Sequence, residues 1–151
     1  MVSTRESTTD ELTELASRLR LTIARTARRL RQQGGTDLSA ALTSALATVE
    51  KCGPLTPSEL ADAERVKRPT ATRIVARLTD QGLVDRAADP SDRRSSLVSI
   101  TPAGRTLLSK LRGRKNAYLA RRMRELGPSE ITALERGADV LEQMLESERR
   151  P

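Results

Sequence analysis

The stretch that decides the fold runs from Thr56 to Gly104 and reads TPSELADAERVKRPTATRIVARLTDQGLVDRAADPSDRRSSLVSITPAG. It opens with a strong helix-start signal. Thr56 can cap a helix, Pro57 suits the first helical position, and Glu59 can return a hydrogen bond to the cap. The sequence therefore predicts a short helix that ends near Glu64, followed by a tight turn.

A second helix is predicted from Pro69 to about Gln81. At about 100° per residue its apolar side chains gather on one side. We expect these residues to face the core: Ala71, Ile74, Val75 and Leu78. On the other side Arg73 and Arg77 lie one turn apart, so both guanidinium groups can point into a DNA groove, where their fork suits guanine edges or phosphates. The predicted DNA-contacting residues of this segment are Lys67, Arg68, Pro69, Thr70, Thr72, Arg73 and Arg77. The alternative is that these side chains only solvate an outer face.

A β-hairpin is predicted next, with strands near residues 83–86 and 96–100. The sequence ADPSDRRSS between them is rich in turn formers and should project as a tip. Arg93 and Arg94 lie on this tip, where a long basic side chain can enter a narrow minor groove. Asp92 would support the wing by pairing with an arginine. Helix, turn, helix and basic wing in this order form a recurrent arrangement for duplex recognition.

The composition favours a DNA-binding protein over an enzyme. The chain of 151 residues suits one domain or two small lobes, and its charge of +7 with a pI near 10.6 should attract a polyanion such as nucleic acid or an anionic membrane. With no His, Trp or Phe, one Tyr and one Cys, it offers no catalytic residues, metal site or cofactor motif. Scarce aromatic rings also argue against single-stranded nucleic acid. No apolar run reaches the length of a membrane span, so we expect a cytoplasmic protein that does not bind membranes.

The middle of the chain resembles the winged helix-turn-helix of the MarR family of bacterial transcription regulators. The resemblance rests on Gly82-Leu83-Val84 after the second helix, Arg86 ahead of Asp89-Pro90, Asp92-Arg93-Arg94 with Val98 beyond, and Thr101 with Gly104. It implies a mainly α fold with a small β-hairpin wing, in which a winged helix-turn-helix is joined to a helical dimerisation region. It also implies a homodimer whose 69–81 helix enters the major groove, while Arg94 reaches the minor groove.

Four further helices are predicted, over about residues 8–33, from Asp37 or Ser39 to Lys51, 102–126 and 131–145. The first should start at a capping box of Thr8 and Glu11, and the third at Thr101, which caps it, with Pro102 as its first residue. Apolar seams on the first and last helices predict a dimer interface made by Leu12, Leu19, Ile23, Leu134, Leu141 and Leu145. We therefore expect a dimerisation helix in residues 1–36, a DNA-binding domain in residues 37–101 and dimerisation helices in residues 102–151. A purely intramolecular bundle is the alternative.

Residues and resemblance together predict a sequence-specific, duplex-DNA-binding transcriptional regulator that binds a pseudo-palindromic operator as a homodimer. The resemblance implies a repressor relieved by a small-molecule effector held between the dimerisation helices and the winged domain. Because Tyr118 is the only aromatic residue, the sequence gives weak support for a phenolic effector. The effector could be aliphatic or large, or there could be none. Cys52 is expected to be buried or half-buried rather than reactive. The alternative function is an architectural DNA-binding or protein-interaction winged-helix protein without an effector.

Overall fold

The computed structural model describes residues 3–92 and 95–147, and these residues form six helices and one two-stranded hairpin. The elements are α1 (Ser3–Gly34), α2 (Ala40–Cys52), α3 (Pro57–Glu64), α4 (Arg68–Asp80), β1 (Val84–Ala88), β2 (Ser96–Ile100), α5 (Pro102–Met123) and α6 (Pro128–Ser147). The chain divides into two compact units, Met1–Lys115 and Asn116–Pro151, with the boundary inside α5. The predicted fold class, mainly helical with a small β wing, is confirmed.

The predicted start and end of α3 are confirmed. The Thr56 hydroxyl accepts a hydrogen bond from the Glu59 N–H at 3.2 Å, and the Glu59 carboxylate accepts one from the Thr56 N–H at 2.7 Å. This reciprocal pair satisfies two backbone donors at the start of the helix. The helix ends at Glu64, and the capping residue Arg65, with a left-handed φ of 53°, turns the chain toward α4.

Helix α4 has the predicted two faces. It begins at Arg68, one residue earlier than expected, which places Pro69 at the second position, where a missing N–H still costs no helical hydrogen bond. The four residues expected to face inward are all buried: Ala71, Ile74, Val75 and Leu78. Helix α4 therefore packs by one side only and leaves the other open.

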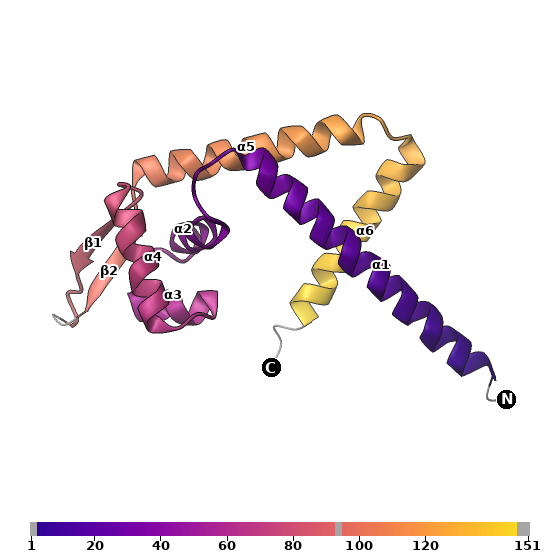
Figure 1. The fold of residues 1–151 in the computed structure, drawn as a ribbon, viewed down its shortest axis with the longest axis horizontal. Helices are drawn as coiled ribbons and strands as arrows, with labels where there is room; N and C mark the ends of the chain where they lie inside the picture. Colours follow the sequence, from indigo (N-terminus) through magenta and orange to yellow (C-terminus); the bar gives the residue numbers. More distant parts are fainter. Residues whose placement is uncertain (1–2, 93–94, 148–151) are drawn as a thin grey trace. The chain divides into compact units, whose positions relative to one another are not determined.

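The hydrophobic core of the first unit joins α2, α3, α4, the hairpin and the start of α5, and Figure 1 shows the three short helices gathered beside the hairpin. Its buried members are Leu42, Ala45, Leu46, Val49, Leu55, Leu60, Ile74, Val75, Leu78, Leu83, Val84, Val98, Ile100 and Leu108. Every one is aliphatic, so shape rather than hydrogen bonding holds this core together. The core fixes α4 by its inner face.

The wing is an antiparallel hairpin with Val84 opposite Ile100. A third segment joins this sheet through a single residue, Leu55, which forms an antiparallel bridge with Val98. The Leu55 N–H donates to the Val98 carbonyl at 3.1 Å, and the Val98 N–H donates back at 2.8 Å. The segment before α3 is thereby tied to the wing, a connection that the sequence did not predict.

The joint between α4, the wing and α5 is built around Thr101, which is 8% exposed. Its hydroxyl donates to the Gly82 carbonyl at 2.7 Å and accepts from the Gly104 N–H at 3.0 Å. The Thr101 N–H donates to the Leu83 carbonyl at 3.1 Å. Thr101 is therefore the predicted cap of α5 and also connects the end of α4 to the base of the wing.

Two expectations about the flanks were wrong. Helix α1 begins at Ser3 rather than at a capping box of Thr8 and Glu11, because no Gly or Pro interrupts the residues between Ser3 and Thr8. Cys52 is exposed rather than buried. It is the last residue of α2 and lies beyond Val49, the last buried residue of that helix.

The terminal helices expose large apolar side chains. In α1, Leu12 and Ile23 are 62% and 47% exposed, and α6 has no buried residue. Helix α5 ends at Met123, three residues before the expected end, because the next hydrogen bonds close three-residue turns, as from Leu126 to Met123. Within the described residues, no helix is both long enough and apolar enough to cross a membrane.

Candidate nucleic-acid interface

The outer face of α4 carries the residues predicted to contact DNA. Arg73 and Arg77 are both exposed, one turn apart, on the side away from the core. The other predicted contacts at the start of the helix are exposed as well, except for the half-buried Thr70: Lys67, Arg68, Pro69 and Thr72. The structure thus brings all seven predicted residues of this segment onto one short helix and its cap.

The two threonines on this face are not equivalent. The Thr72 hydroxyl donates to the Arg68 carbonyl at 3.0 Å, so its proton is engaged and its oxygen is left to accept. Thr70 instead lines a hollow of 260 Å³ together with Arg73, Arg77 and Ser39. The face therefore offers an acceptor at Thr72 and a group of donors around the hollow.

The base of the wing tip is organised by Asp89. Its carboxylate accepts hydrogen bonds from the Ser91 hydroxyl at 2.6 Å and from the Ser91 N–H at 2.8 Å. These bonds, the hydroxyl first, lower the pKa of the Asp89 carboxyl. The Ser95 N–H donates to the Asp92 carbonyl at 2.9 Å.

The tip arginines, Arg93 and Arg94, lie outside the described residues. Their predicted role in the minor groove and the pairing of Asp92 with an arginine remain predictions. Nearer the core, the Arg86 guanidinium donates to the Ser96 hydroxyl at 2.8 and 3.3 Å across the two strands. Arg86 thus braces the stem of the wing, a role that its spacing from Asp89 did not indicate.

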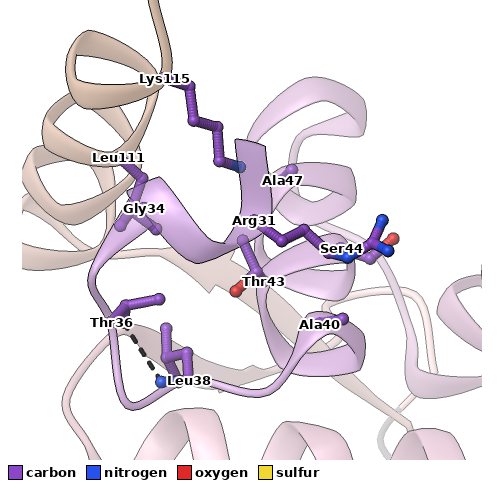
Figure 2. Close-up of a pocket in the computed structure, with 10 residues that line it drawn as sticks. All are labelled: Arg31, Gly34, Thr36, Leu38, Ala40, Thr43, Ser44, Ala47, Leu111 and Lys115. Carbon is purple, nitrogen blue, oxygen red and sulfur yellow. Dashed lines mark hydrogen bonds between the residues drawn. The ribbon is translucent and has the colours of Figure 1, made fainter. Parts of the chain in front are cut away.

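A second site lies where the end of α1, the start of α2 and α5 meet. It is a pocket of 340 Å³, a size suited to a small molecule. Figure 2 shows its lining residues: Arg31, Gly34, Thr36, Leu38, Ala40, Thr43, Ser44, Ala47, Leu111 and Lys115. None of them carries an aromatic ring or an acidic group, and two are cationic.

Two arginines of α5 hold this region together. Arg114 donates from one guanidinium nitrogen to the carbonyl oxygens of Gly34 and Gly35, at 3.0 and 2.9 Å, and so caps the C-terminal end of α1. Arg112 forms an ion pair with Glu50 near the end of α2, and this hydrogen bond raises the pKa of the Arg112 guanidinium. The pocket walls are therefore tied to one another through α5.

These contacts could not be found from the sequence pattern. Arg31 and Lys115 line one pocket although 84 positions separate them along the chain. Helical periodicity reports which face a residue occupies but not which distant helix it meets. The single available signal was the run of arginines at the end of α1.

Comparison with known proteins agrees with this geometry. Residues 38–96, from the turn before α2 to the second strand of the wing, match the family model described as "MarR family". An uncharacterized HTH-type transcriptional regulator of Mycobacterium bovis is 39% identical over 133 residues, which cover 87% of this chain and 93% of the relative. The chain belongs to the MarR family of transcriptional regulators.

Solved structures extend the likeness to the MarR fold over most of the chain. A Pseudomonas aeruginosa protein described as a transcriptional regulator superposes with a TM-score of 0.83 at 30% identity, covering 89% of this chain and 96% of that one. A mutant MarR from E. coli gives a TM-score of 0.72 at 25% identity, with 87% and 96% covered. The protein is thus a DNA-binding transcriptional regulator and a member of a non-enzymatic family.

Proposed function

We propose that this MarR-family protein is a cytoplasmic repressor that binds a pseudo-palindromic operator as a homodimer and leaves it when a small anion binds. The observation that carries the proposal is the division of α4 into a fully buried apolar face and an open face with Arg73 and Arg77. A helix held rigidly by one side can present its other side to the major groove. The wing, with Arg93 and Arg94, would add contacts in the neighbouring minor groove.

The apolar seams of the terminal helices support the homodimer. The residues proposed for the interface are Leu12, Leu19, Ile23, Leu134, Leu141 and Leu145, and five of the six are 39–63% exposed, whereas Leu141 is half-buried. Exposed leucines in rows mark surfaces that associate. In this division residues 37–101 bind DNA, and residues 1–36 and 102–151 hold the two copies together. Two α4 helices would then face matching half-sites about one DNA turn apart.

The pocket at the end of α1 supports an anionic effector with an apolar body. Arg31 and Lys115 supply positive charge, while Leu38, Ala47 and Leu111 supply apolar surface. A carboxylate on a short hydrocarbon fits both properties, and no ring is required for stacking. Such a ligand would relieve repression only if it binds the DNA-bound and free arrangements with different affinity.

Selection of bound duplexes from a random pool tests the DNA-binding half of the proposal. We expect an inverted repeat with two matching half-sites. Arg73→Ala should then weaken binding by about tenfold to a hundredfold and relax preference at one base position in each half-site. Arg94→Ala should weaken binding with less effect on major-groove bases. Arg136→Ala, on α6, is the matched control and should leave binding unchanged. Coating of DNA without a selected repeat would contradict the proposal.

The effector half is tested by titrating the operator complex with acetate, hexanoate and benzoate. We expect the two larger carboxylates to release DNA and acetate to have little effect, because only the larger ones fill the apolar wall. A variant with Arg31→Ala and Lys115→Ala should bind DNA normally and lose the response. Release that is unchanged in this double variant would place the effector elsewhere.

A further inference from the structure

The part of α1 from Leu15 onward carries a concentrated positive charge. From Leu15 to Gly34 the helix contains six arginines and no acidic residue. All six are exposed: Arg18, Arg20, Arg25, Arg28, Arg29 and Arg31. None of these six arginines forms an ion pair with another described residue of the first unit. Arginines one turn apart, such as Arg25 and Arg29, repel each other, so this helix favours an anionic partner.

Helix α6 has the opposite character. Glu135, Asp139, Glu142 and Glu146 recur at spacings of four, three and four residues, which keeps them on one face of the helix. All four are exposed, and within the described part of the second unit none forms an ion pair. Each directly follows a small or large aliphatic residue of the apolar row. The acidic face therefore lies along one edge of the α6 seam.

Some of the arginines of α1 border its own apolar seam, on both sides of it. Arg18 and Arg20 stand on either side of Leu19, and Arg29 precedes Leu30. The arginine-rich part of α1, from Leu15 to Gly34, and the whole of α6 each contain 20 residues, so each is about 30 Å long. Charges that border an apolar seam determine which helix pairs with which. The two helices thus match in length, in apolar surface and in charge.

We infer that the acidic face of α6 in one copy binds the arginines beside the α1 seam in a second copy of this chain. The inference rests on the proposed homodimer and deepens it, because it names the contacts that select an identical chain as the partner. The three arginines beside the α1 seam, Arg18, Arg20 and Arg29, against four carboxylates of α6, twice per dimer, make association sensitive to salt. They also exclude a related chain that lacks the acidic face.

Charge reversal tests this pairing. One variant carries Glu135→Lys, Asp139→Lys and Glu142→Lys; the other carries Arg18→Glu, Arg20→Glu and Arg29→Glu. Subunit mixing is followed by energy transfer between donor and acceptor dyes on Cys52, which is exposed and the single cysteine of the chain. We expect each variant alone to self-associate at least about tenfold more weakly than the wild type, and their mixture to form a heterodimer of wild-type affinity.

The controls and the contrary outcomes are distinct. Arg28→Glu and Arg136→Glu, on faces away from the seams, should associate normally, and wild-type association should weaken from about 0.05 to about 0.5 M NaCl. Circular dichroism checks that each variant keeps its helices. If a charge-reversed variant loses helicity, the variant with Gln at the same positions is used in its place and should show a smaller loss of self-association.

Normal self-association of both reversed variants would overturn the inference. The inference would also be overturned if a chain that carries both reversals associated normally while a mixture of the two single-reversal variants did not. That result would indicate that α1 and α6 pair within one copy. Normal association with weaker DNA binding in the α1 variant would assign the arginines to DNA instead. A dimer that ignores these charges but selects an inverted repeat leaves the proposed function intact.

Discussion

Replacing Gly104 by alanine should destabilise the winged region, although alanine is the better helix former. Gly104 lies in the first turn of α5, and a Cβ there would meet the Leu83 carbonyl oxygen at 2.3 Å and the Ile100 Cγ1 at 2.8 Å. The Leu83 carbonyl is also fixed by the hydrogen bond from Thr101. Since carbon and oxygen approach no closer than about 3.3 Å without strain, α5 and the wing would have to separate by about 1 Å.

The expected magnitude follows from two opposed effects. Overpacking against a backbone atom costs about 3 kcal/mol, the upper part of the usual range, and the higher helix propensity of alanine returns about 1 kcal/mol. Gly104→Ala should therefore lower the free energy of unfolding by about 2 kcal/mol. Gly113→Ala is the matched control in the same helix, because the added Cβ meets no atom within 4 Å apart from its chain neighbours and the nearby backbone of its own helix. It should raise the free energy of unfolding by about 0.5–1 kcal/mol.

Urea unfolding of both variants and the wild type, at one protomer concentration, measures these changes. The unfolding midpoint should fall for Gly104→Ala and rise for Gly113→Ala. A midpoint for Gly104→Ala at or above that of the wild type would refute the close approach of α5 to the base of the wing.

Two further predictions concern hydrogen bonds at helix starts. Thr101→Val keeps the shape of the side chain but removes both hydrogen bonds of its hydroxyl, so the free energy of unfolding in urea should fall by about 2–4 kcal/mol. Thr101→Ser keeps the hydroxyl and should lower it by less than about 1 kcal/mol. Equal losses in the two variants would contradict this role of Thr101. Hydrogen bonds from Thr56, above all from its backbone N–H, lower the pKa of Glu59. The stability that these bonds provide is therefore present above the unfolded-state pKa near 4.5 and is lost as the pH falls through the lower folded-state pKa. Glu59→Gln keeps the cap but cannot titrate, and its unfolding midpoint should fall less than that of the wild type on acidification below about pH 4.5; parallel pH curves would rule out this contribution.

Local signals in the sequence were sufficient for α3 and α4. The capping box at Thr56 is a reciprocal contact between residues three apart, so sequence spacing alone determines it. The inward face of α4 follows from helical periodicity, and the structure buries it as predicted. The same reasoning identified Thr101 as a cap, whereas Gly104 was noted only as part of the family resemblance. Only the structure supplies the reason for the glycine, which is the Leu83 carbonyl.

Long-range contacts were beyond such reasoning. The bridge between Leu55 and Val98 joins a single residue to the wing, too short to leave an alternating pattern. The bond from Arg114 to Gly34 spans 80 positions of the sequence. Cys52 was misjudged for a related reason, since burial at the end of a helix depends on where its packing partners stop and not on periodicity.

The two parts of the chain differ in what stabilises them. The winged region encloses its own aliphatic core, whereas α6 buries no residue and exposes Leu134 and Leu145 by 49% and 63%. An isolated helix of this length is marginal in water, and burying one leucine stabilises it by about 1.5–3 kcal/mol. The seams must therefore associate for the terminal helices to be stable. In the proposed dimer each winged helix-turn-helix is held by its own core. The spacing between the two α4 helices depends instead on contacts between the terminal helices, which are more easily changed. A ligand at the end of α1 would act on those contacts without disturbing the core that holds Arg73 and Arg77 in place.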